Sequence, residues 1–195
     1  FDNIIPNLYG IAVLIYNNCY TSITSNVMTR VRIGIQTGNF YNSDLGTNHS
    51  ITNNEVESYR VGIFHNLAYT NATAYTISDN VFTTLAGAPN NNGMVIASIQ
   101  SAVGATITDN DVSDARVGCN LWNCPTTNTI TITGGNLTDC NIGVFPNNYD
   151  GYSSDAATSS YIISGVNITN CDTSIWIRDN NLNTNSSTVT LNINN

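Results

Sequence analysis

Arginine and aromatic residues recur together at fixed distances along this chain, and they are the residues best suited to bind a ligand. The repeat is clearest when one small residue is numbered zero: Gly34, Gly62, Gly118, Gly143 or Ser174. Position −2 then holds Arg32, Arg60 and Arg116, and position +2 holds Gln36, Phe64, Asn120, Phe145 and Trp176, with Trp122 and Arg178 at position +4. Aromatic rings offer apolar faces, and guanidinium groups form paired hydrogen bonds to carboxylate or sulfate. Such a surface suits a flat polar ligand, for example a sugar chain.

The small residue at position zero would leave a low strip of backbone between the arginines and the aromatic rings. The carbohydrate site predicted on this strip consists of Arg32, Arg60, Arg116, Glu57, Asp114, Phe64, Trp122, Phe145 and Trp176. The alternative is an ordinary charged surface, because Glu57 and Asp114 precede Arg60 and Arg116 closely enough to pair with them. The sequence leaves both interpretations open.

Groups that could perform catalysis are sparse. A glycoside hydrolase needs two carboxylates across the scissile bond, and a lyase needs a base near the sugar ring. The one dense carboxylate group is Asp109, Asp111 and Asp114, which strand alternation does not place on one face. The chain has no Lys, its histidines (His49 and His65) are isolated, and no His/Cys spacing is typical of zinc. We therefore predict a non-catalytic module without metal or cofactor; a polysaccharide lyase or hydrolase is the alternative.

Charge and hydropathy limit the partners of the chain. Among 195 residues, 13 are acidic and five basic, which gives a net charge of −8. Nucleic acid is not an expected partner, because few basic residues are available to neutralise phosphates. The longest apolar run, residues 11–16, is far shorter than the roughly 20 residues of a membrane helix, so membrane insertion is not expected. Five cysteines permit an oxidising compartment, and we expect an extracellular or cell-surface location.

An internal repeat determines the expected architecture. Eleven residues before position zero stand Ile23, Ile51, Ile107, Ile132 and Ile163, and position −6 is apolar as well. With Ile77 and Leu191, these markers follow one another at intervals of 25 to 31 residues. Abundant Asn, Thr, Ser and Gly disfavour helix, and the apolar residues alternate as they do in half-buried strands. The sequence predicts an all-β, right-handed, single-stranded parallel β-helix of about seven coils, with residues 1–195 forming one domain.

The repeat also resembles that of a known family. The phrase Ile-Thr-Asn-Asn-x-Val followed by Val-Gly-Ile, from Ile51 to Ile63, and its echo from Ile107 to Cys119 are similar to the parallel β-helix repeats of pectate-lyase-like proteins. The resemblance covers most of the chain and implies the fold. It says little about chemistry, because that fold hosts lyases, hydrolases and adhesins.

Stacking converts each repeat position into a ladder of equivalent residues. Besides the Ile ladder, we expect positions −3, −1 and +1 to point inward. An asparagine ladder is expected at a turn, where the backbone tolerates a left-handed conformation; its members are Asn26, Asn54, Asn80 and Asn110, with Gly134, Gly135 and Gly165 taking over that corner in later coils. Cys140 and Cys171 both occupy position −3 in successive coils, where they either form a disulfide or are simply small buried residues.

The outward face beside the Ile ladder and the two ends suggest further roles. Ser or Thr flanks the ladder Ile in most coils, which resembles the ice-binding face of some β-solenoids and is a minor alternative function. Both ends of the stack expose unpaired strand edges, which invite further pairing. We therefore expect either further coils of the same protein or end-to-end association with identical copies.

Overall fold

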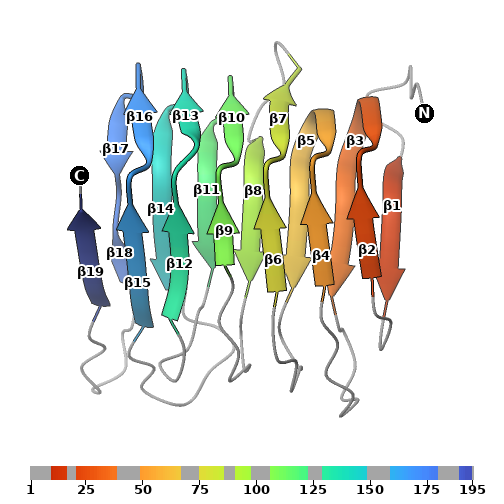
Figure 1. The fold of residues 1–195 in the computed structure, drawn as a ribbon. Helices are drawn as coiled ribbons and strands as arrows, with labels where there is room; N and C mark the ends of the chain where they lie inside the picture. The colour runs from red at the N-terminus through yellow and green to blue at the C-terminus, as the bar shows by residue number, and fades with distance from the viewer. Residues whose placement is uncertain are drawn as a thin grey trace.

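The computed structural model describes residues 10–16, 21–38, 49–66, 75–85, 91–97, 106–122, 129–148, 159–179 and 189–194. The regular secondary structure in these ranges consists of β-strands alone, and every strand pair is parallel. The strands stack along one axis, so that the colour of the chain runs steadily from one end of the molecule to the other (Figure 1). The protein is a parallel β-solenoid, which confirms the predicted fold class. No helix long and apolar enough to cross a membrane is found in the ranges just given.

Each complete coil contributes strands to three columns, which we number in the order the chain meets them. The first column is a seven-stranded sheet in which each strand comes from a successive coil: β2 (Thr21–Thr24), β4 (His49–Thr52), β6 (Tyr75–Ser78), β9 (Thr106–Thr108), β12 (Thr129–Thr133), β15 (Ser159–Ser164) and β19 (Val189–Asn194). Its register places each ladder Ile beside the next, for example Ile51 beside Ile77. This register explains why the Ile spacing is the strongest signal in the sequence.

The second and third columns belong to one twelve-stranded sheet, because two long strands, β3 (Val27–Gly38) and β5 (Glu55–Asn66), run through both. The second column continues with β7 (Val81–Thr84), β10 (Asp111–Ser113), β13 (Asn136–Thr138) and β16 (Asn167–Thr169). The third column contains β1 (Ile11–Tyr16), β8 (Asn92–Ala97), β11 (Val117–Trp122), β14 (Ile142–Asn148), β17 (Thr173–Ile175) and β18 (Arg178–Asp179). The predicted candidate site lies mainly on the third column.

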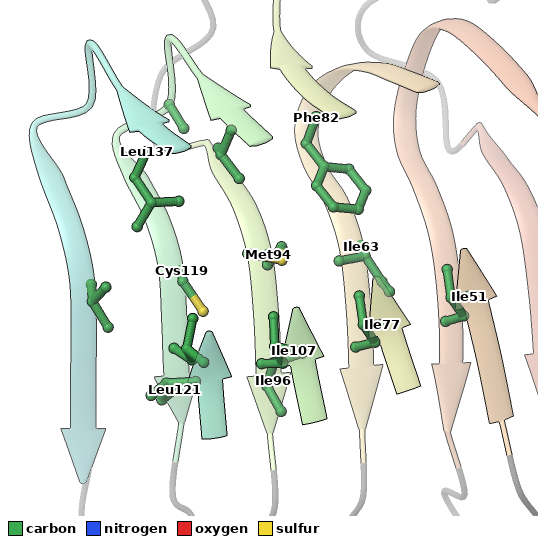
Figure 2. Close-up of a cluster of buried hydrophobic side chains, with 14 of the residues drawn as sticks. Ile51, Ile63, Ile77, Phe82, Met94, Ile96, Ile107, Cys119, Leu121 and Leu137 are labelled. Atoms are coloured by element: carbon green, nitrogen blue, oxygen red, sulfur yellow. The ribbon is translucent and has the colours of Figure 1, made fainter. Parts of the chain in front are cut away.

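The interior is a continuous apolar column enclosed by the three strand columns. Figure 2 shows Ile77 and Ile107 of the first column near Ile63 and Ile96 of the third column, and all four belong to one buried apolar cluster. The ladder residues of the first and second columns are nearly inaccessible to solvent: Ile23, Ile51, Ile77, Ile107, Ile132 and Ile163, and Met28, Val56, Phe82, Val112 and Leu137. Since one coil cannot bury these side chains alone, the stacking of coils is what forms the core.

The predicted asparagine ladder is confirmed. Asn80 Nδ2 donates to Asn110 Oδ1 at 2.8 Å, and Asn54 Nδ2 donates to Asn80 Oδ1 at 2.9 Å. The left-handed residue is not the ladder Asn, as the sequence suggested, but the residue before it: Ser25, Asn53, Asp79 and Asp109 have φ of 52° to 56°. In the next coil Gly135 replaces the Asn, with φ of 76°, and a Cβ there would lie 2.2 Å from the Asn110 carbonyl oxygen.

Of the three positions predicted to point inward, position −3 does so only in part and position −1 does not. Val31, Ala115 and Cys140 at position −3 are buried, but β3 and β5 pair with a register shift that buries Ser58 in place of Tyr59. Position −1 lies on the outer face: Val117 and Ile142 pack in a small cluster separate from the core. The alternation fails because positions zero and +1 both face inward, so position −1 is left outside.

The glycines at position zero therefore face the core, and not the outer surface. A Cβ on Gly34 would lie 2.3 Å from a methyl carbon of Val56, and a Cβ on Gly62 would lie 2.6 Å from the ring of Phe82. Each glycine leaves room for the second-column ladder residue of the following coil. The expectation that these glycines point outward as a bare strip is wrong, although the outer surface at this position is bare for another reason.

Candidate functional site

A groove of about 380 Å³ lies on the outer face of the third column, across four consecutive coils. Its lining residues fall into two rows: Ile33, Val61 and Asn92 at position −1, and Gln36, Phe64, Val95 and Asn120 at position +2, with Arg60 beside them. We call these the −1 row and the +2 row. The volume is within the range of about 300–1,000 Å³ of small-molecule sites.

The floor of the groove is main chain. Between the two rows, position zero and position +1 both face the core; Gly62 and Ile63 are fully buried examples. Two successive residues therefore place no side chain on the outer surface, and a trough is left between the rows. Neighbouring strands are about 4.8 Å apart, so the groove from β3 to β11 is about 14 Å long.

The groove combines one charged group with an aromatic ring and amides. Arg60 is exposed, and the structure gives it no ion pair with Glu57 or any other described residue. Phe64 is half-buried one rung away from Val95 in the +2 row. Asn120 Nδ2 donates to Asn92 Oδ1 at 3.5 Å, whereas Asn120 Oδ1 has no hydrogen-bond partner among the described residues. A ligand with an anionic group, an apolar face and hydroxyls would find a complementary group for each.

The structure brings together only some of the predicted site residues. Arg60 and Phe64 line the groove, whereas Arg32 and Arg116 do not. The arginines do not form a continuous ladder, because the coil between Arg60 and Arg116 presents Asn91, whose Oδ1 accepts a hydrogen bond from the Arg116 backbone N–H. This arginine-free coil was not recognised from the sequence, because an insertion before Gly93 obscures the residue at its position −2.

The predicted acidic residues lie away from the groove. Glu57 pairs in register with Thr83 in the second column, and Asp114 occupies the corner before the third column with φ of 60°. Asp109 and Asp111 are at the other corner and at the start of β10. None of these carboxylates is among the residues that line the groove.

The predicted site contains three aromatic residues besides Phe64, namely Phe145, Trp176 and Trp122. Phe145 is only 8% exposed and its ring stacks on that of Trp176, with centroids 5.0 Å apart; Trp176 itself is 48% exposed. Neither lines the groove. The side chain of Trp122 lies outside the described residues.

The disulfide alternative for Cys140 and Cys171 is not realised, since both are free thiols. Their sulfurs donate instead to main-chain carbonyls: Cys140 to Thr138 at 3.4 Å and Cys171 to Thr169 at 3.5 Å. Burial, with a smaller contribution from the neighbouring Cys171, raises the pKa of the Cys140 thiol to about 11. Cys140 is therefore a protonated core residue at neutral pH.

Sequence reasoning missed two sets of residues. Ile33, Val61 and Asn92 line the groove because position −1 faces outward, against the expectation from alternation. His65 is fully buried and its Nδ1 is hydrogen-bonded to Thr37 Oγ1 in the preceding coil. The two stand at equivalent positions of adjacent coils, a spacing that the sequence shows but that does not reveal which face they occupy. Among the described residues, no group of three or more His, Cys, Asp or Glu could hold a metal ion.

Comparison with known proteins adds no identification: no family model, curated protein or solved structure matches this chain.

Proposed function

We propose that this chain is a non-catalytic structural β-solenoid module that binds carbohydrate in the groove of the third column. One observation carries the proposal: Arg60, Phe64 and the amides of Gln36, Asn92 and Asn120 surround a floor of bare main chain. A sugar chain offers hydroxyls to the amides and a C–H face to the ring of Phe64. A carboxylate or sulfate on the sugar would be the natural partner of Arg60.

The wider setting of this proposal is also an inference. The repeat from Ile51 to Ile63 supports a place among pectate-lyase-like β-helix proteins. The five cysteines in the sequence support an extracellular or cell-surface location. Further coils, or identical copies added end to end, are the partners that a solenoid with parallel strand edges favours.

The test is an array of neutral, uronate and sulfated glycans probed with the wild type and single variants. Arg60→Ala should weaken binding of acidic glycans about 10- to 100-fold, because a hydrogen bond to a charged group contributes about 1.5–3 kcal/mol. Phe64→Ala should weaken binding of all recognised glycans. Arg116→Ala is the matched control, since Arg116 is an exposed arginine outside the groove.

The outcomes separate the hypotheses. Binding that Arg60→Ala and Phe64→Ala leave unchanged rejects the groove as the site. Release of unsaturated products from pectate, alginate or chondroitin, detected as a rise in ultraviolet absorbance that Arg60→Ala abolishes, would instead establish a lyase. Absence of both binding and turnover would leave a purely structural solenoid and reject the proposal.

A further inference from the structure

The groove ends at β11 although the two rows that form its walls continue into the next coil. Asn120 is the last lining residue, and its neighbour in the +2 row is Phe145 on β14. In the −1 row the series continues from Val117 to Ile142 in the same register. The main-chain floor continues too, because Gly143 and Val144 are both buried. Something other than the backbone must therefore stop the groove.

Phe145 fills the trough at this coil. Although it belongs to the +2 row, its ring packs with Val117 and Ile142 of the opposite row in a small apolar cluster outside the core. The ring is only 8% exposed, whereas Phe64, at the equivalent position on β5, is half-buried and lines the groove. Phe145 thus crosses from one wall of the trough to the other.

Trp176 supports this arrangement from the adjacent coil. Its ring stacks on that of Phe145 at a centroid distance of 5.0 Å and an interplanar angle of 23°. The indole remains 48% exposed and lies on the side of Phe145 away from the groove, because β17 follows β14 in the sheet. Toward β1 the residue beside Gln36 is Leu14, which is 43% exposed and so differs from the buried Phe145.

We infer that Phe145, backed by Trp176, is the end wall of the groove and restricts the site to the terminus of an acidic glycan chain. The inference rests on the proposed function and specifies its mode of recognition. A sugar chain that lies along the solenoid axis would enter over β3 and stop against Phe145. The groove of about 14 Å accommodates a short oligosaccharide, and residues beyond that length would extend outside the site.

The experiment uses oligogalacturonates of two to eight residues and polygalacturonate as probes. Calorimetry measures the affinity for each probe, and light scattering measures how many protein molecules bind to each polygalacturonate polymer. For the wild type we expect affinity to rise with length and then level off, with four and eight residues agreeing within about twofold. The amount of protein bound to polygalacturonate should be proportional to the number of polymer ends. In Phe145→Ala the eight-residue probe should bind at least fivefold more tightly than the four-residue probe, and several copies should bind along each polymer. Phe145→Leu, which keeps an apolar side chain in the trough, should retain the wild-type length dependence.

Each result distinguishes the end wall from the site itself. Wild-type protein that binds at many positions along each polymer overturns the end wall, and this measurement does not depend on whether Phe145→Ala folds. If the affinity keeps rising from four to eight residues while Arg60→Ala and Phe64→Ala still weaken binding, the carbohydrate site stands and the end wall falls. If no oligogalacturonate binds at any length, the inference fails, whereas the proposed carbohydrate site is rejected only if no glycan of the array binds in the groove.

Discussion

Replacement of Asn80 by alanine is the sharpest test of what holds the coils together. The Asn80 side chain is fully buried and makes five hydrogen bonds. Nδ2 donates to the carbonyls of Ile51 and Ser78 and to Asn110 Oδ1, at 2.8 to 2.9 Å. Oδ1 accepts from both the backbone N–H and Nδ2 of Asn54, at 3.0 and 2.9 Å. Alanine would remove all five, four of which are buried.

The expected loss follows from these contacts. Each neutral hydrogen bond contributes about 1 kcal/mol net, and a partner left unsatisfied costs about 1–3 kcal/mol. Water that enters the space left by the amide would restore some of the bonds. We therefore expect Asn80→Ala to lower the free energy of unfolding by about 3–5 kcal/mol, a large share of the roughly 5–15 kcal/mol of a typical domain. For a chain of this size such a loss corresponds to a Tm lower by about 10 °C.

The matched control is Asn26→Ala at the first rung of the same ladder. Asn26 is exposed, and its side chain makes two hydrogen bonds, to the Thr24 carbonyl and to Asn54 Oδ1. Its loss should cost about 1 kcal/mol or less. Urea unfolding followed by circular dichroism measures both variants. Equal destabilisation of the two would refute the reasoning, because the buried bonds would then contribute no more than the exposed ones.

Two further predictions concern the core beneath the groove. Gly62→Ala should destabilise the fold by about 1–3 kcal/mol, because its Cβ would lie 2.6 Å from both the Phe82 ring and the Gly93 carbonyl oxygen; an unchanged urea midpoint would contradict the inward orientation of this glycine. Cys140 has a folded-state pKa of about 11 against an ordinary 9.0, so its protonated thiol contributes stability that is fully present below about pH 9 and is lost as the pH rises toward 11. In Cys140→Ala this part of the pH dependence of unfolding should disappear, and a wild-type slope in the variant would show that another group is responsible.

The sequence was sufficient to predict features that recur in several successive coils. Ile51 and Ile77 belong to a series of apolar residues that recurs every 25 to 31 residues, and they lie side by side in the first column because a solenoid places equivalent residues one rung apart. Asn54 and Asn80 could be placed at a turn for the same reason, and their amides form the predicted ladder. Recurrence at a fixed offset therefore indicates stacking even when the loops between strands vary in length.

The direction of side chains near the groove could not be predicted in the same way. Period-two alternation places Val61 and Ile63 on the same face, yet Val61 lines the groove and Ile63 lies in the core. The alternation is interrupted at Gly62, and a sequence pattern does not show where a strand departs from regular pleating. The end wall is equally hidden, because Phe64 and Phe145 occupy equivalent positions and only their packing distinguishes them.

The groove and the core are consequently two faces of one structural feature. Val56 and Phe82 of the second column need the space beneath Gly34 and Gly62, so these positions must turn a residue without a side chain inward. Because the next residue also faces inward, the outer surface lacks side chains along the same line, and the trough results. A ladder residue of larger volume would press against the floor from below, while one of smaller volume would leave a cavity there. The affinity of the groove should therefore respond to core substitutions such as Phe82→Leu, although Phe82 is not one of the residues that line it.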